Sequence, residues 1–353
     1  MDTEKTRVDA DKLVILASRI LQRFKVPEEG ALITARVLVA ADLRGVDTHG
    51  IASFIPFYIK GLREGTIKAR PTIKVVDTVL SVATIDGDQG LGFIVAYRAM
   101  IEAIKRATKT GAGFVSVRNS THYGPGFYYA MMALKQDMIG IAMTSPIPEV
   151  VAPGSSKTAI GTNPLSVAVP SSKKPPFVLD MATSVVAAGK LRKAILEGKS
   201  IPEGWAIDKD GQPLTDPTKR VLGEGGLLPL GGIPVLGSYK GFGLGVLVEI
   251  LCALLSGTAP GISRMQGAAT SHFIGALRID SFLPVDTFKQ SMDEMISAFE
   301  ALPKLPGIDN IYVAGGYEAE IEKERKANGI PLHPKVLMDL KALAEETGVK
   351  YDL

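Results

Sequence analysis

The first part of the chain has apolar residues at helical spacing. They predict an amphipathic helix over residues 11–24 and a second helix from Pro27 to Arg44. A third helix, interrupted by a proline, is expected over residues 51–63. We therefore expect residues 1–72 to form a helical domain.

From about residue 70 the pattern changes to short apolar runs separated by glycine, which is typical of strands. Strands are predicted at 74–76, 80–85, 113–117, 139–143, 165–169 and 177–180, with a last one near 273–279. Helices are predicted at 94–108, 128–135, 242–255, 287–301 and 319–327. Residues 201–238 are rich in Gly and Pro and are expected to form a long loop region over a site. This order predicts an α/β fold, with a sheet-containing domain over residues 73–317.

The composition is that of an ordinary globular protein. Of the 353 residues, 46% are apolar and 22% are charged, and the net charge of only +3 gives no reason to expect nucleic acid as a partner. The single cysteine, Cys252, excludes an intramolecular disulfide and a cysteine-based zinc site. The N-terminus lacks an apolar signal core, and no apolar run reaches the roughly 18 residues of a membrane span, so we expect a cytoplasmic protein without membrane contact.

Two of the four histidines lie in short polar stretches that contain glycines and border apolar segments. His49 lies in the sequence LRGVDTHG, and His122 lies in RNSTHYG. Histidine changes charge near neutral pH, so both are candidate proton carriers, and Arg44, five residues before His49, could bind a small anion. Each could instead be a structural histidine bonded to the backbone, which is our interpretation of His272 and His333.

The usual nucleotide-binding motifs are absent from the sequence. No Gly-x-Gly-x-x-Gly follows a strand, and no phosphate loop ends in Gly-Lys-Ser or Gly-Lys-Thr, so a standard Rossmann or P-loop site is not expected. Lys240 and Gly241 open an apolar helix whose free amides could bind a phosphate or carboxylate, although close packing explains the glycine as well. Asp180 ends a strand, where it could contact a ligand or cap a helix.

At these residues the chain resembles the malate/L-lactate dehydrogenase family. Members are nicotinamide oxidoreductases that lack a Rossmann fold, and they include ureidoglycolate, sulfolactate and diketogulonate enzymes. The resemblance runs from the first helix to near the end of the chain. Five motifs carry it: Asp42-Leu43-Arg44-Gly45-Val46-Asp47-Thr48-His49-Gly50, Asn119-Ser120-Thr121-His122-Tyr123-Gly124, Gly161-Thr162-Asn163-Pro164-Leu165, Asp180-Met181-Ala182-Thr183-Ser184 and Lys240-Gly241-Phe242-Gly243.

The resemblance implies hydride transfer between NAD or NADP and C2 of a small 2-oxo or 2-hydroxy acid. Arg44 could bind the substrate carboxylate, and His122 or His49 could act as the acid/base, with His122 ranked slightly ahead. The cofactor contacts that the resemblance implies are Asp180, Met181, Ala182, Thr183, Lys240, Gly241, Gly315 and Gly316. No metal is implied.

Two positions depart from the pattern of many family members. Thr144-Ser145-Pro146 replaces Thr-Asn-Ser, which affects an expected contact to the nicotinamide end, and Gly315-Gly316 replaces Gly-Glu, which affects a polar contact to the cofactor. The resemblance also implies that residues 318–353 join the helical domain and that the protein is a homodimer. The alternatives are a non-catalytic small-anion-binding protein and a metal-dependent hydrolase or lyase that uses His49, His122 and Asp180.

Overall fold

The computed structural model describes residues 6–220, 224–264 and 269–353. Its α-helices are α1 (Ala10–Arg23), α2 (Glu28–Leu43), α3 (Lys60–Glu64), α4 (Gly92–Thr110), α5 (Phe127–Met132), α6 (Ala188–Leu196), α7 (Ser238–Cys252), α8 (Val285–Glu300), α9 (Gly316–Asn328) and α10 (Pro334–Thr347). Its strands are β1 (Thr6–Val8), β2 (Lys74–Val79), β3 (Val82–Asp86), β4 (Ala112–Ser120), β5 (Met138–Ser145), β6 (Val150–Val151), β7 (Thr158–Ile160), β8 (Leu165–Val169), β9 (Phe177–Met181), β10 (Ala206–Ile207), β11 (Gly226–Leu227), β12 (Thr270–Arg278) and β13 (Ile330–Leu332). The predicted α/β class is confirmed.

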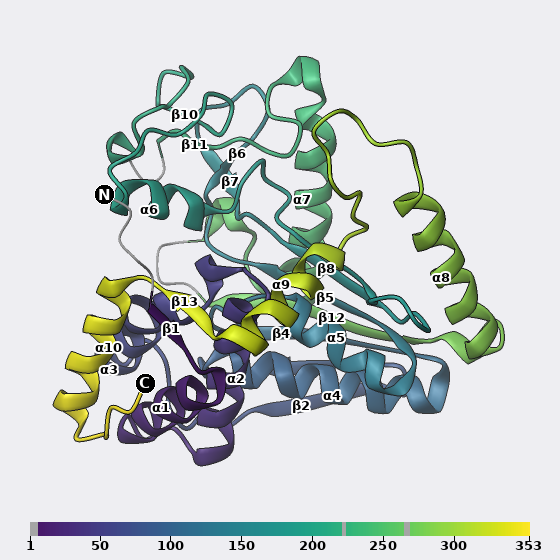
Figure 1. Ribbon diagram of the computed structural model, residues 1–353, viewed down its shortest axis with the longest axis horizontal. Coiled ribbons are helices and arrows are strands. Elements are labelled where there is room, and N and C mark those ends of the chain that lie inside the picture. Colours follow the sequence, from purple (N-terminus) through teal and green to yellow (C-terminus); the bar gives the residue numbers. More distant parts are fainter. Residues whose placement is uncertain (1–5, 221–223, 265–268) are drawn as a thin grey trace.

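A seven-stranded sheet forms the centre of the molecule, in the order β2-β3-β4-β12-β5-β8-β9. Only the β3–β4 pair is parallel, and the other neighbours in this sheet are antiparallel. Figure 1 shows α4 below the sheet and α7 above it. α4 packs closely on β4, because a Cβ added at Gly113 would lie 2.0 Å from the carbonyl oxygen of Ala103. The two faces of the sheet are thus covered by different helices.

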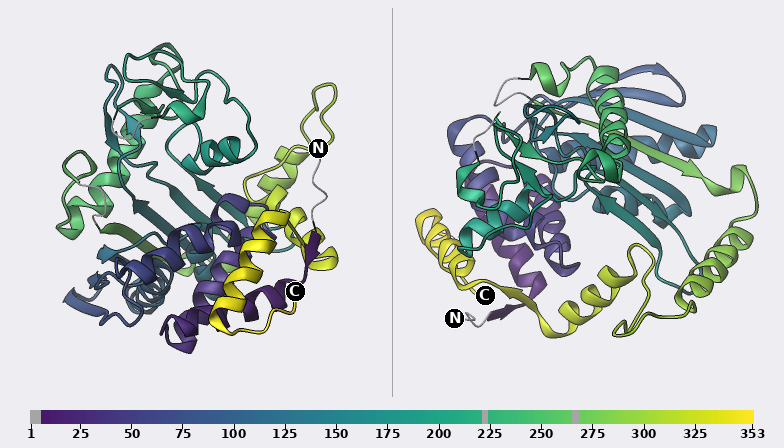
Figure 2. Two further views of the ribbon diagram at one scale, coloured as in Figure 1. Left: turned by 90° about the vertical axis from the view of Figure 1, so that its left-hand side faces the viewer. Right: turned by 90° about the horizontal axis from the view of Figure 1, so that it is seen from above.

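The two ends of the described chain lie together. β1 pairs with β13 in an antiparallel ladder in which Thr6 faces Leu332, and α1 contacts α10. Both views in Figure 2 show the last helix beside the first ones. Salt bridges add to this packing, because Arg325 of α9 lies 2.5 Å from Asp47. The C-terminal segment is therefore placed next to the stretch that contains His49.

A second, smaller sheet lies above α6 in Figure 1, with the order β10-β11-β6-β7. It has its own apolar cluster, which includes Val150, Leu191 and Leu227. Residues 201–238, expected to be a long loop, thus contain two short strands and two 3-10 helices among the residues described. Strands of two residues are too short to produce a periodic pattern, and residues 221–223 of this stretch fall outside the described part.

The start of α7 and the presence of α10 also differ from the prediction. α7 begins at Ser238, four residues before the predicted start, because Gly237 adopts a left-handed conformation with φ of 90° directly before it. α10 was not predicted at all; Pro334 occupies its first turn, and the His333 side chain accepts from the Lys335 amide at its N-terminus. Its weakly amphipathic sequence explains why periodicity missed it.

By length and composition alone, the stretch Ser238–Ser256 is apolar enough to cross a membrane, which the sequence analysis did not predict. In the structure this stretch packs against β5 and β12 and carries the buried Glu249. Glu249 forms an ion pair of 2.5 Å with Arg264. The helix is therefore part of the interior on one side, while Leu247 and Ile250 on its other side are exposed.

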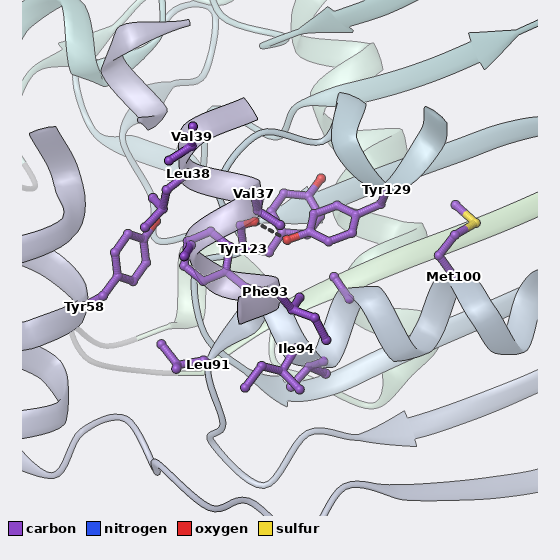
Figure 3. Close-up of a cluster of buried hydrophobic side chains, with 14 of the residues drawn as sticks. Val37, Leu38, Val39, Tyr58, Leu91, Phe93, Ile94, Met100, Tyr123 and Tyr129 are labelled. Atoms are coloured by element: carbon purple, nitrogen blue, oxygen red, sulfur yellow. Dashed lines mark hydrogen bonds between the residues drawn. The ribbon is translucent and has the colours of Figure 1, made fainter. Parts of the chain in front are cut away.

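An aromatic cluster joins the N-terminal helices to the sheet domain (Figure 3). Tyr58 packs edge-on against Phe93, with ring centroids 4.6 Å apart, and Tyr123 stacks on Tyr129 at 4.9 Å. The Tyr129 hydroxyl donates to the Tyr123 carbonyl, the dashed line in the figure. Burial of four such rings is a large apolar contribution. It fixes the loop that contains His122 against the helix that contains Tyr58.

Candidate active site

The structure brings His49 and His122 together. Their rings stack with centroids 5.7 Å apart and planes inclined by 21°. His49 ends a 3-10 helix, η1 (Asp47–His49), and is half-buried, whereas His122 lies in the loop after β4 and is exposed. Two histidines that are 73 positions apart therefore form one pair.

The turn that contains His49 is held by a buried carboxylate. Asp42 accepts a hydrogen bond of 2.7 Å from the Ile51 amide, and a Cβ on Gly50 would lie 1.9 Å from an Asp42 oxygen. Only glycine fits there. The Thr48 hydroxyl lies 3.1 Å from Nδ1 of His49 and orients that ring.

The loop of His122 is held in a similar way. Gly92 begins α4 directly under the loop, because a Cβ at Gly92 would lie 2.1 Å from the Thr121 carbonyl oxygen. The Gly124 amide donates to Nδ1 of His122 at 3.3 Å, and Gly124 itself needs a φ of +75°. Close backbone packing, as well as the site itself, thus explains the glycines in the two histidine motifs LRGVDTHG and RNSTHYG.

Tyr58 completes the histidine pair and was missed by the sequence analysis. Its hydroxyl lies 2.7 Å from Nδ1 of His122. Because the Gly124 amide can only donate to that nitrogen, the neutral ring accepts from both partners and carries its hydrogen on Nε2. Nε2 has no hydrogen-bond partner in the described part of the chain, so it is available to a ligand. Tyr58 lies in a π-helix, η3 (Phe54–Ile59), a type of turn that is frequent at functional sites.

Both histidines favour the neutral state. Burial lowers the pKa of His49 to about 4, and the positive charge of Arg192 acts in the same direction. His122 keeps an open edge, but the protein around it removes much of its hydration and lowers its pKa to about 3, with further lowering by His49 and Arg192. An anion placed between these groups would raise both pKa values again.

Arg192 on α6 is the second residue that the sequence analysis missed. Its guanidinium carbon lies 4.8 Å from the centroid of the Phe57 ring, which directly precedes Tyr58. The Arg192 side chain has no hydrogen bond or ion pair with any residue that the structure describes. No strand or helix was predicted around residue 192, so nothing in the sequence indicated which way this arginine faces.

Arg44, the predicted carboxylate-binding residue, is buried at 6% exposure. Its Nη1 atom lies 2.9 Å from Glu322 of α9, and its guanidinium stacks on Phe127 at 5.1 Å. Its Nε atom has no partner within the described residues. Arg44 therefore lies next to the chain's C-terminal segment and retains one free donor.

Asp180 lies close to Arg44, at the end of β9. It accepts from the Ser166 hydroxyl at 2.6 Å and from the Phe127 amide at 3.0 Å, which caps the N-terminus of α5. Burial raises the pKa of Asp180, although hydrogen bonds and the charge of Arg44 oppose the rise. Both Asp180 and Arg44 thus touch Phe127 and form one side of the site.

The other predicted cofactor residues gather around β9 and α7. The buried Thr183 carbonyl accepts from the Leu230 amide at 2.9 Å, and a Cβ on Gly241 would collide with Leu230. Met181 and Ala182 are half-buried between Asp180 and Thr183. Gly315 and Gly316 lie beside Val178 of β9, because the Val178 amide donates to the Ala314 carbonyl.

A cavity of about 460 Å³ opens near the N-terminus of α7. It is lined by Gly154, Ser155, Pro229 and Ser238 among others, and it does not reach the histidines. The Ser238 hydroxyl is buried without a hydrogen-bond partner among the described residues. Lys240, two residues further on, is exposed.

Thr144 and Ser145, which belong to the first departure from the family pattern, are buried. Ser145 is fully buried, donates to Glu249 at 2.8 Å and accepts from Arg264 at 2.6 Å. Thr144 lies 2.8 Å from Nδ1 of His272. These side chains make their hydrogen bonds inside the protein. His272 is fully buried with both ring nitrogens bonded, as the structural interpretation expects.

A metal centre finds no support in the part of the chain that the structure describes, where no three side chains of His, Cys, Asp or Glu gather as ligands. Cys252 is buried and free of disulfides.

Comparisons with known proteins agree with this geometry. A family model described as malate/L-lactate dehydrogenase matches residues 8–341. The chain is 41% identical to the malate dehydrogenase of Pyrococcus horikoshii, covering 99% of this chain and 98% of that one, and 38% identical to the L-sulfolactate dehydrogenase of Methanocaldococcus jannaschii, covering 94% and 95%. The crystal structure of malate dehydrogenase from Entamoeba histolytica superimposes with a TM-score of 0.95 at 32% identity, covering 99% and 100%. The chain belongs to the malate/L-lactate dehydrogenase family and is an oxidoreductase of the 2-hydroxy acid dehydrogenase class.

Proposed function

We propose that the protein interconverts a small 2-oxo acid and its 2-hydroxy acid, as malate and L-lactate dehydrogenases do, with NAD or NADP as cofactor. The observation that carries this proposal is the stacked pair of His49 and His122. Nε2 of His122 has no hydrogen-bond partner among the described residues, and the positive charge of Arg192 acts on both rings. Carbonyl reduction requires a proton donor and a cation for the acid, and both are present.

In this proposal His122 is the acid/base and His49 supports it. In the reducing direction the doubly protonated His122 gives its Nε2 proton to the C2 oxygen. The ring then keeps its proton on Nδ1, where the Tyr58 oxygen accepts a hydrogen bond from it, so the ring leaves the step in the other tautomer. In the oxidising direction this Nδ1–H tautomer removes the hydroxyl proton with Nε2. The protein lowers the pKa of His122, and the carboxylate of a bound substrate raises it again. Substrate binding is therefore coupled to the uptake of a proton by His122.

Arg44 is the proposed partner of the C1 carboxylate. Its guanidinium is positioned by the Phe127 ring, and its free Nε donor supports the role. For its Nη1 atom to bind the substrate as well, Arg44 would have to release Glu322 and take the substrate carboxylate in its place. The Glu322 side chain is itself partly exposed. We expect Arg44→Ala to raise KM for the oxo acid by roughly 10- to 100-fold.

The residues around β9 and α7 fit a nicotinamide dinucleotide. Ser238 offers an unsatisfied buried hydroxyl, Lys240 a charge, and the N-terminus of α7 the positive end of its helix dipole, which suit a phosphate. The proposed contacts are Asp180, Met181, Ala182, Thr183, Lys240, Gly241, Gly315 and Gly316. When bound, the cofactor supplies or accepts the hydride.

We also propose that this cofactor site is not of the Rossmann type. A Rossmann site needs a parallel, doubly wound sheet, whereas in the described seven-stranded sheet only β3 and β4 are parallel neighbours. In the same proposal residues 1–72 and 318–353 form one helical domain, and residues 73–317 form the catalytic one. The β1–β13 ladder supports this division, although one apolar cluster runs through both parts.

A homodimer and a cytoplasmic location complete the proposal. α7 exposes Leu244, Leu247 and Ile250, spaced three residues apart, and the following turn exposes Leu254 and Leu255. A contiguous apolar face of this kind is typical of an interface between subunits. Sedimentation should then give twice the chain mass of 37.5 kDa; a monomer at micromolar concentration would contradict it.

The test of the function is absorbance at the nicotinamide band. NADH or NADPH is mixed with the protein and with pyruvate, 2-oxobutyrate, oxaloacetate or sulfopyruvate in turn. We expect oxidation of one cofactor with at least one of these acids. No turnover with any of them, together with no binding of either cofactor, would overturn the proposal.

A further inference from the structure

One positive charge at the site has no role in the chemistry described so far. Arg192 is exposed, and its guanidinium lies over Phe57 without an ion pair among the described residues. The carboxylate of Glu149 acts on it from nearby but is itself paired with Arg220 at 3.4 Å. Arg192 is therefore an uncompensated cation that a ligand can reach.

The position of α6 places Arg192 near the two histidines. Gly189 in the first turn of α6 touches the loop of His49, since a Cβ there would lie 2.9 Å from Cβ of Thr48. Arg192 follows three residues later and so lies on the same face of the helix. Its contact with Phe57 places it next to Tyr58, the hydrogen-bond partner of His122.

Arg44 and Arg192 differ in their surroundings. Arg44 is buried, paired with Glu322 and adjacent to Asp180. Arg192 is open and unpaired, and it is the arginine whose charge acts on His49 and His122. A substrate whose single carboxylate binds Arg44 would leave Arg192 without a partner.

We propose that Arg192 binds a second anionic group of the substrate. The preferred substrates are then 2-oxo acids that carry a carboxylate or sulfonate on C3, and Arg192 is a specificity-determining residue. The Phe57 ring holds the guanidinium by its face and leaves the N–H edge free for a bidentate contact with such a group. This inference rests on the proposed function, in which Arg44 binds the C1 carboxylate.

The test compares oxaloacetate with 2-oxobutyrate, which has a methyl group in place of the second carboxylate. For Arg192→Gln we expect kcat/KM for oxaloacetate to fall roughly 10- to 100-fold, the effect of losing a charge-assisted hydrogen bond. The value for 2-oxobutyrate should change less than about 3-fold. Arg192→Lys, which keeps the charge, should recover part of the loss with oxaloacetate.

Lys193→Gln is the matched control, because Lys193 lies on the same helix, pairs only loosely with Glu197 at 3.8 Å and is exposed. It should leave both substrates unchanged. NADH binding, followed as quenching of the single tryptophan Trp205, should be equal in all variants, which separates substrate recognition from cofactor binding. Equal losses for oxaloacetate and 2-oxobutyrate in Arg192→Gln, or no loss with either, would overturn this inference while leaving the proposed function intact. A wild-type protein without turnover would instead reject the proposed function.

Discussion

His122 and His272 are both neighbours of Tyr123 and make an informative comparison. Tyr123 follows His122 in the chain and stacks on His272 at 4.6 Å. The protein environment lowers the pKa of each histidine to about 3. Yet His272 is fully buried between the hydroxyls of Ser120 and Thr144, while His122 is exposed and keeps Nε2 unbonded. A lowered pKa therefore does not distinguish the two histidines, whereas solvent access and a free ring nitrogen identify the candidate proton carrier.

The largest expected effect is on catalysis by the open histidine. His122→Gln removes the proposed proton donor, so kcat should fall roughly 100- to 10,000-fold, with quenching of Trp205 by NADH unchanged. His49→Gln, measured in the same assay, should lose less. If His49→Gln loses more than His122→Gln, the two roles are exchanged.

The buried histidine should matter for stability instead. His272→Ala leaves the hydroxyls of Ser120 and Thr144 without their ring partner and opens a cavity, so the free energy of unfolding should fall by about 3 kcal/mol. Urea denaturation measures this change. His333→Ala is the control, because the helix cap that it removes is worth about 1 kcal/mol. A His272→Ala protein of wild-type stability but low kcat would reverse the comparison.

The same contrast predicts a pH dependence of stability. The folded-state pKa of His272 lies below that of the unfolded chain, so its contribution is complete above about pH 6.5 and is lost as pH falls toward 3. At pH 5 the loss amounts to roughly 2 kcal/mol. His272→Gln should therefore show a shallower decline of the urea midpoint between pH 7.5 and 5. Parallel declines in both proteins would show that His272 titrates normally.

The smallest effect concerns the partner of His122. Tyr58→Phe removes the hydroxyl that lies 2.7 Å from Nδ1 but keeps the ring packed on Phe93. We expect kcat to fall about 10-fold with little change in KM, because the hydrogen bond orients the imidazole and does not hold substrate. An unchanged kcat and pH profile would show that the Gly124 amide alone orients the ring.

Much of the fold followed from periodicity. The helix predicted at 11–24 is α1, and the strand predicted at 113–117 is the middle of β4. Both elements have apolar stripes that local sequence reveals. α10 and the small sheet did not follow, because a weak stripe and two-residue strands give no period.

The site was predictable where its residues lie in short motifs. His49 and His122 were expected to act in one site, and the structure stacks them. Tyr58 and Arg192 were not found, because their relevance depends on contacts across the fold: the Tyr58 hydroxyl meets a ring 64 positions away, and Arg192 reaches the site through α6. Long-range assembly of this kind leaves no signal in a single sequence.

We infer that His122 is neutral in the free protein and gains a proton when an anionic substrate binds. Calorimetric titration of the NADH-saturated protein with oxamate, a non-reacting 2-oxo acid analogue, measures this directly when repeated in buffers of different ionisation enthalpy. At pH 7 we expect uptake of about one proton by the wild type and almost none by His122→Gln. Tight binding of oxamate without proton uptake by the wild type would contradict it.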